Sequence, residues 1–209
     1  IGESDVPDGP YSIEAMARDA LGVLDAAGWP HADVLGISMG GMIAQQLALL
    51  APERLRRLVL GCTTCGGVAQ TPAEPEVLDA IQPKPGVDPL EAVRGMMRVN
   101  FTPAWIEANP ERFEALVRDR FRQRRRVKGI EAQMAAIGRF DLADAVTAID
   151  APALVVHGTG DRLIPFVNGE ALAARIPGAR LEPLPEAGHL FWEMDEGRSA
   201  ELIRGFLGP

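Results

Sequence analysis

Two short apolar segments, residues 33–37 and 58–60, are separated by a single apolar segment with helical spacing that stops before Pro52. Each short apolar run is typical of a buried strand. Strands joined through a helix run parallel, because such a connection is a crossover and not a hairpin. The sequence therefore predicts a βαβ unit and an α/β fold.

The rest of the chain continues this pattern around one interruption. A helix is predicted at residues 12–27, with Ser12 as its N-cap and Gly28 just beyond its end. Further strands are expected at 153–157 and 179–184, and further helices at 166–176 and 197–207. Between the two strand-bearing regions, a proline-rich entry leads into helical segments without strand signals. We therefore expect a first core part at 1–71, a helical cap at 72–147 and a second core part at 148–209.

Composition excludes several classes of protein. The 209 residues are 47% hydrophobic and 24% charged, as in ordinary globular domains. A net charge of -8 argues against nucleic-acid binding, and the apolar runs are too short to cross a membrane. Cys62 and Cys65 cannot form a disulfide framework and fit a reducing, cytoplasmic setting. Their Cys-x-x-Cys spacing, without a second such pair, leads us to expect no metal site.

The sequence Gly36-Ile37-Ser38-Met39-Gly40 joins the first predicted strand to the helix that follows it. This setting is typical of a nucleophile elbow, in which glycines relieve crowding in a sharp turn and the serine hydroxyl projects above the sheet. The helix N-terminus would also favour developing negative charge at Ser38. The alternative is an ordinary Gly/Ser turn.

A serine hydroxyl needs a general base, and the base needs an orienting carboxylate. His31 precedes the first strand and lies at the wrong end of the sheet, while His157 ends a strand, where a packing or capping role is the simpler interpretation. His189 follows the last predicted strand, at the carboxyl end expected for Ser38. Asp161 reaches the same edge, although an aspartate in such a turn often serves only the turn.

Three motifs together carry a resemblance to a known family: residues 35–41, 152–165 and 187–189. Through them the chain resembles α/β-hydrolase-fold enzymes with a helical cap, especially bacterial esterases and enol-lactonases. The resemblance spans residues 2–207. It implies a mostly parallel sheet with helices on both faces, and the roles of nucleophile for Ser38, orienting acid for Asp161 and base for His189.

The resemblance also implies a serine hydrolase that cleaves a carboxylic ester or lactone through an acyl-enzyme on Ser38, with the Met39 amide as an oxyanion donor. This chemistry requires no metal or organic cofactor, and its partner is a small-molecule substrate. A thioesterase, a C–C-bond hydrolase and a cofactor-free perhydrolase would use the same triad. A non-catalytic fragment or binding protein is the alternative from another class. Side chains that would line an acyl pocket, or equally well pack in the core, are Met96, Phe101, Trp105, Phe140 and Trp192.

Family members usually carry an N-terminal half-sheet with a second oxyanion donor, whereas this chain begins at Ile1. Gly2-Glu3-Ser4 resembles the end of a stretch that follows this half-sheet. We therefore expect a longer polypeptide, or a partner that covers the open edge of the strand with Val34. A bare parallel edge favours aggregation, and a lost oxyanion donor costs about 100- to 1000-fold in rate. The 209 residues alone are thus expected to be poorly soluble and nearly inactive, with the oligomeric state left open.

Overall fold

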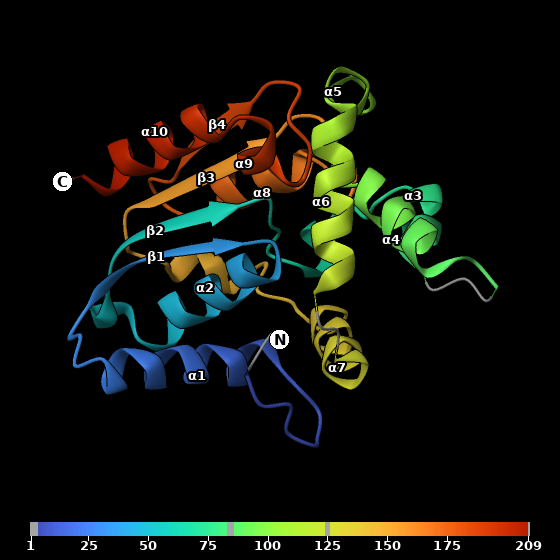
Figure 1. Ribbon diagram of the computed structural model, residues 1–209. Helices are drawn as coiled ribbons and strands as arrows, with labels where there is room; N and C mark the ends of the chain where they lie inside the picture. Colours follow the sequence, from blue (N-terminus) through green and yellow to red (C-terminus); the bar gives the residue numbers. More distant parts are fainter. Residues whose placement is uncertain (1–3, 83–85, 124–125, 209) are drawn as a thin grey trace.

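The computed structural model describes residues 4–82, 86–123 and 126–208. At its centre is a four-stranded sheet in the order β1-β2-β3-β4, with every pair parallel. The strands are β1 (Ala32–Ile37), β2 (Leu55–Gly61), β3 (Ala153–Gly158) and β4 (Arg180–Leu184). All four therefore end at one edge of the sheet (Figure 1), and the predicted parallel α/β fold is confirmed.

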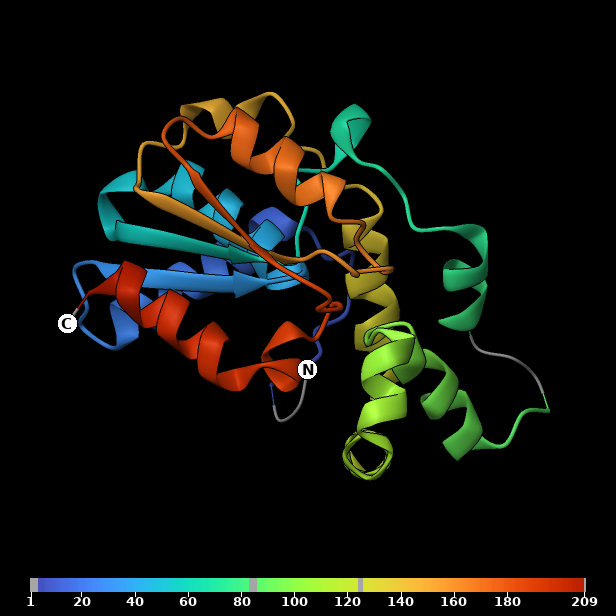
Figure 2. The same ribbon diagram turned by 90° about the horizontal axis from the view of Figure 1, so that it is seen from above.

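Successive strand residues face opposite layers, as the period of a strand requires. Leu58, Leu60 and Val155 pack in one core cluster, whereas Val59 and Val156 pack in another. The first cluster is covered by α1 (Ile13–Ala26), α2 (Met39–Leu50) and α8 (Val167–Arg175). The second is covered by α9 (Phe191–Met194) and α10 (Glu196–Leu207). Figure 2 shows α10 and α8 on opposite sides of the sheet, so both faces are buried as predicted.

Local signals set the helix ends near the site. The Ser12 hydroxyl oxygen accepts a hydrogen bond from the Ala15 amide at 3.0 Å, which makes it the N-cap of α1. Gly28 follows this helix with φ +68°, a left-handed conformation that glycine adopts without strain. α2 ends at Leu50, just before the short 3-10 helix η1 (Pro52–Arg54). These boundaries agree with the sequence-based expectations.

Between β2 and β3, the described residues form five α-helices, which lie beyond the carboxyl ends of the strands (Figure 1). They are α3 (Pro75–Ala80), α4 (Pro89–Arg98), α5 (Pro103–Ala108), α6 (Pro110–Arg122) and α7 (Val127–Ile137). The sequence predicted a loop where α3 forms; Pro75 begins this helix because proline suits the first helical position. The segment that leaves the sheet and the segment that returns to it lie side by side, because Gly66 and Asp141 form an antiparallel β-bridge.

The helical segment is tied to the sheet domain by specific contacts. Arg112 of α6 forms an ion pair with Glu193 of α9 at 2.7 Å. The Leu190 amide donates a 3.1 Å hydrogen bond to the Asn100 carbonyl oxygen, between α4 and α5. Met194 and Leu190 also pack against the apolar cluster inside the helical segment. In the described part of the chain, no helix is long and apolar enough to cross a membrane.

Gly2 and Glu3, which carry part of the resemblance at the start of the chain, lie outside the described residues. β1 forms one edge of the four-stranded sheet that the structure describes. Its central residue Leu35 is 44% exposed.

Candidate active site

Ser38 occupies the sharp turn between β1 and α2. Its backbone has φ 56° and ψ -122°, a conformation that is costly for a residue with a β-carbon. Two hydrogen bonds hold this turn against β2: the Ser38 amide donates to the Gly61 carbonyl oxygen, and the Thr63 hydroxyl donates to the Ser38 carbonyl oxygen, both at 2.8 Å. The turn therefore has the strained strand-to-helix form that a nucleophile elbow requires.

Asp161 and His189 come together from the loops that follow β3 and β4. Oδ2 of Asp161 lies 2.8 Å from Nδ1 of His189, and both side chains are buried. Oδ1 of the same carboxylate accepts hydrogen bonds from the amides of Leu163 and Ile164, each at 2.9 Å. Asp161 thus organises its own turn with one oxygen and contacts the histidine with the other.

The charge state of Asp161 fixes the tautomer of His189. Burial by itself would raise the pKa of Asp161, but hydrogen bonds from His157 and His189 outweigh it and lower the pKa to about 2. The carboxylate is therefore ionised at neutral pH and can only accept hydrogen bonds. Nδ1 of His189 must then carry the proton that it donates, which leaves Nε2 of the neutral ring as an unprotonated base.

Cys62 lies beside this pair, at the end of β2. Its sulfur and the ligating atoms of Asp161 and His189 lie within 4.8 Å of one another. By distance alone, these three side chains could bind one metal ion. Burial raises the pKa of the Cys62 thiol well above its usual value, and the negative charge of Asp161 raises this pKa further. The thiol is therefore protonated, and both Asp161 oxygens already accept hydrogen bonds, which is a poor donor set for a metal.

Backbone strain marks the same edge of the sheet. Among the described residues, the non-glycine positions with positive φ are Ser38 (56°), Cys62 (44°) and Glu186 (59°). They follow β1, β2 and β4. Such strain persists only where the surrounding structure enforces it, and it clusters at functional sites. Cys62 directly follows a strand, as Ser38 does. This position is the sequence signal that could have predicted Cys62 at the site.

The structure distributes the predicted pocket residues over several clusters. Phe101 is fully buried inside the helical segment, where it stacks on Trp105 with ring centroids 4.7 Å apart and Met96 packs close by. Phe140 shares a cluster with Met39, the residue after Ser38. Trp192 contacts Phe191 edge-to-face and packs on the face of the sheet that α9 and α10 cover.

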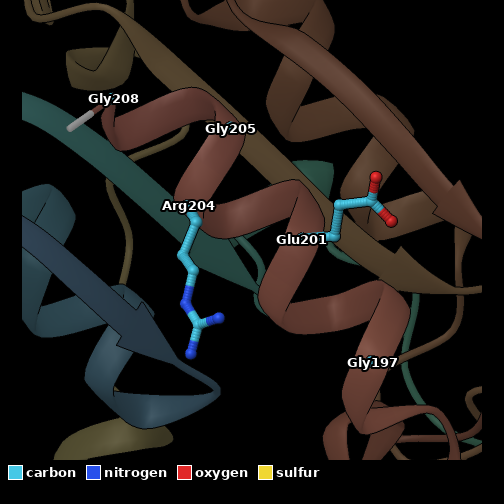
Figure 3. A pocket seen from close by; sticks show the side chains of 5 residues that line it. All are labelled: Gly197, Glu201, Arg204, Gly205 and Gly208. Atoms are coloured by element: carbon cyan, nitrogen blue, oxygen red, sulfur yellow. The ribbon is translucent and has the colours of Figure 1, made fainter.

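A hollow of about 620 Å³ lies along α10 and is separate from these residues. Its lining comes from one face of the helix and includes three glycines. Figure 3 shows the side chains of Glu201 and Arg204 pointing in different directions from that helix. Ser38, Asp161 and His189 do not line this hollow, so it is not part of the candidate active site.

Known hydrolases are similar to this chain over most of its length. The family model for the alpha/beta hydrolase fold matches residues 1–193. The 2-hydroxymuconate semialdehyde hydrolase of Pseudomonas putida is 33% identical, with 99% of this chain and 73% of the relative covered. The 3-oxoadipate enol-lactonase 2 of Acinetobacter baylyi is 30% identical, with coverages of 90% and 68%.

A solved structure gives the same result in three dimensions. Est816, described as an N-acyl homoserine lactone degrading enzyme, superimposes with a TM-score of 0.81 at 30% identity and covers 98% of this chain and 78% of its own. Sequence and structure thus match hydrolases over nearly the whole chain. The protein belongs to the alpha/beta hydrolase fold family.

Proposed function

We propose that the protein is a serine hydrolase that cleaves a carboxylic ester or a lactone through an acyl-enzyme on Ser38. One observation carries this proposal: the buried 2.8 Å hydrogen bond between Asp161 and His189 lies at the sheet edge where the strained turn holds Ser38. An elbow serine, a histidine and an orienting aspartate are the groups by which hydrolases activate a hydroxyl.

The proposed reaction follows from the tautomer of His189. Nε2 of His189 accepts the Ser38 hydroxyl proton as the serine oxygen bonds to the substrate carbonyl carbon. The same proton then passes to the departing alcohol oxygen as its bond to that carbon breaks. Water repeats the sequence on the acyl-enzyme, and Asp161 stabilises the imidazolium that forms twice.

The first turn of α2 supplies the proposed oxyanion donor. The amides of Gly41 and Met42 donate to the Ser38 carbonyl oxygen, at 2.9 and 3.2 Å. The amide of Met39 comes before these, in the part of a helix whose N–H groups lack partners within the helix. It therefore suits the negative oxygen of a tetrahedral intermediate, in a region where the helix dipole also favours negative charge.

The substrate class is proposed from two sources. The names of the relatives include an enol-lactonase and an N-acyl homoserine lactone degrading enzyme. Phe140 shares a hydrophobic cluster with Met39, and Trp192 shares another with Ile37, which keeps both aromatic residues as candidates for contact with an acyl group. Full burial of Phe101 within the helical segment favours a packing role for that side chain.

We assign substrate choice to the helical segment, residues 72–147. Its helices lie beyond the edge of the sheet that carries the triad residues (Figure 1), where insertions commonly overhang a site. Exchange of this segment for that of a relative should change the preference among esters and lactones while Ser38 still reacts with a probe. Unchanged preference in a folded exchange variant would contradict this assignment.

A serine-directed fluorophosphonate probe, combined with a panel of esters, lactones and thioesters, tests the proposal. With the full-length protein, we expect labelling at Ser38, located by mass spectrometry, and turnover of a short p-nitrophenyl ester or a lactone. Ser38→Ala and His189→Ala should each lower kcat by at least about a thousandfold, and Asp161→Asn should retain a measurable remainder.

Ser199→Ala is the matched control. The Ser199 hydroxyl is buried without a hydrogen-bond partner in the described part of the chain, so its loss should leave labelling and turnover unchanged. Labelling of another residue, or hydrolysis that survives in Ser38→Ala, would refute the serine mechanism. Labelling without turnover of any ester, lactone or thioester would favour a non-catalytic binding protein.

A further inference from the structure

A second histidine contacts the carboxylate of Asp161. His157 is the penultimate residue of β3 and is fully buried. Its Nε2 atom lies 2.8 Å from the Ile164 carbonyl oxygen and 3.4 Å from Oδ2 of Asp161. Oδ2 is also the atom that lies 2.8 Å from Nδ1 of His189. One carboxylate oxygen therefore sits between two imidazoles.

The surroundings of the ring set its protonation state. Both neighbours of Nε2 are oxygen acceptors, so Nε2 carries a proton. Nδ1 is buried without a hydrogen-bond partner among the described residues. A second proton on Nδ1 would create a buried donor without an acceptor among the described residues, which is unfavourable. The ring hydrogen of His157 therefore lies on Nε2, which is the opposite tautomer to that of His189.

The ring has little freedom to leave this position. Phe166 meets it edge-to-face, with ring centroids 5.8 Å apart. On the Nδ1 side, a β-carbon at Gly169 would lie only 2.5 Å from Nδ1, so the backbone of α8 approaches the ring closely. Packing thus holds the Nε2–H toward the Ile164 carbonyl oxygen and Asp161, where it supports both the turn and the carboxylate.

We propose that His157 is a positioning residue for the hydrolytic reaction: its Nε2–H holds Oδ2 of Asp161 in place and shares the negative charge that this oxygen presents to His189. The inference rests on the proposed function, because it assigns His157 a role through Asp161 and His189. Among the described residues, the protonated thiol of Cys62 also faces this cluster.

Two consequences separate this role from simple packing. Without the His157 donor, Oδ2 loses its 3.4 Å contact with a protonated ring nitrogen, so Asp161 is held less precisely and kcat falls. The carboxylate charge is also shared with one donor fewer, so it stabilises the His189 imidazolium more strongly. The acidic limb of the kcat/KM profile, which reports the base in the free enzyme, should then move to higher pH.

The test compares His157→Leu, which has no donor, with His157→Gln, whose amide nitrogen can occupy the position of Nε2. We expect kcat in His157→Leu to fall about ten- to a hundredfold, the size of one charged hydrogen bond, with the acidic limb displaced upward. His157→Gln should restore most of kcat and return the limb toward its original position. Val155→Ala, two residues earlier on the same buried strand, should lower stability without moving the limb.

Several outcomes would overturn the inference. They are a folded His157→Leu variant with unchanged kcat and pH profile, a folded His157→Gln variant that behaves like His157→Leu, or a displaced limb in Val155→Ala. If His157→Leu does not fold, nitrogen-15 NMR of the wild-type protein decides instead. His157 should show the Nε2–H tautomer and His189 the Nδ1–H tautomer, with exposed His31 as the reference. A charged or Nδ1-protonated His157 would refute the inference.

The outcomes distinguish a failure of this inference from a failure of the proposed function. If Ser38 is neither labelled nor needed for hydrolysis, the proposed function is wrong whatever the histidine tautomers are. If Ser38 is labelled and esters are hydrolysed, but His157 variants leave the reaction unchanged, only the positioning role is wrong.

Discussion

A β-carbon placed on Gly36 would lie 2.2 Å from the carbonyl oxygen of Gly40, far inside contact distance. The two ends of the Ser38 turn therefore touch backbone to backbone. A β-carbon on Gly40 would meet nothing within 4 Å, whereas one on Gly41 would lie 2.6 Å from the Thr63 side chain. The crowding expected at Gly36 and Gly40 is thus found at Gly36 and Gly41.

Gly36→Ala and Gly40→Ala form a matched pair for this relationship. In Gly36→Ala the new methyl group meets a backbone oxygen that no rotamer change can move, so we expect a loss of about 1–3 kcal/mol of unfolding free energy and slower labelling of Ser38. In Gly40→Ala the methyl group has open space and the helix gains up to about 1 kcal/mol. Urea unfolding checks both, and equal stability of the two variants would contradict the argument.

Asp161 should make the protein sensitive to acid. Its pKa is lowered from 3.8 to about 2 in the folded state, so its contribution to stability is fully present above pH 3.8 and is lost as pH falls toward 2. The contribution is about 2 kcal/mol. Urea titrations of wild type and Asp161→Asn at pH 5, 4 and 3 should therefore converge as pH falls. Parallel curves would show that the pKa of Asp161 is not lowered by folding.

Cys62 and Cys65 should be inert toward thiol reagents in the folded protein. Both side chains are buried, and burial raises the pKa of each thiol. Iodoacetamide at pH 8 should therefore modify neither thiol in the native protein and both in denaturant, as counted by mass spectrometry. Rapid modification of native Cys62 would mean that the space beside Asp161 is open to solvent.

Gly188 joins the His189 loop to the helical segment. A β-carbon on Gly188 would lie 2.6 Å from the Asn100 carbonyl oxygen and 3.0 Å from the Phe101 α-carbon, both backbone atoms. Gly188→Ala should therefore push the helical segment away from His189, lower stability by about 1–3 kcal/mol and lower kcat/KM for p-nitrophenyl esters. Gly205→Ala is the control, because a β-carbon there meets nothing within 4 Å. Equal effects in the two variants would contradict this coupling.

Much of the fold could be predicted because its signals are local. Ser12 caps α1 with its own side chain, Gly28 takes the left-handed conformation after this helix, and Pro52 stops the helix before it. Pro103 and Pro110 each begin a helix at the position that proline favours. α3 and α9 were missed because short helices have too few turns for a periodic apolar pattern.

The candidate site was only partly predictable. Ser38, Asp161 and His189 could be selected because each follows a strand, and parallel strands end at one edge whatever their separation in sequence. The sequence favours a packing or capping role for His157, and it predicts no metal site at Cys62 because a second Cys-x-x-Cys pair is lacking. Their contacts with Asp161 depend on the conformations of the loops after β2 and β3, and the apolar periodicity of the sequence does not predict loop conformations.

The amino-acid sequence by itself determined the α/β class and most helix ends, since turn chemistry and apolar periodicity act over a few residues. It also offered Ser38, Asp161 and His189 as the candidate catalytic residues. Only the tertiary structure decided which oxygen of Asp161 meets which histidine, and that Cys62 lies beside them. It also decided that Gly41, and not Gly40, is the tightly packed glycine of α2. These outcomes depend on packing between segments far apart in sequence, where shifts of an ångström separate a hydrogen bond from a mere contact.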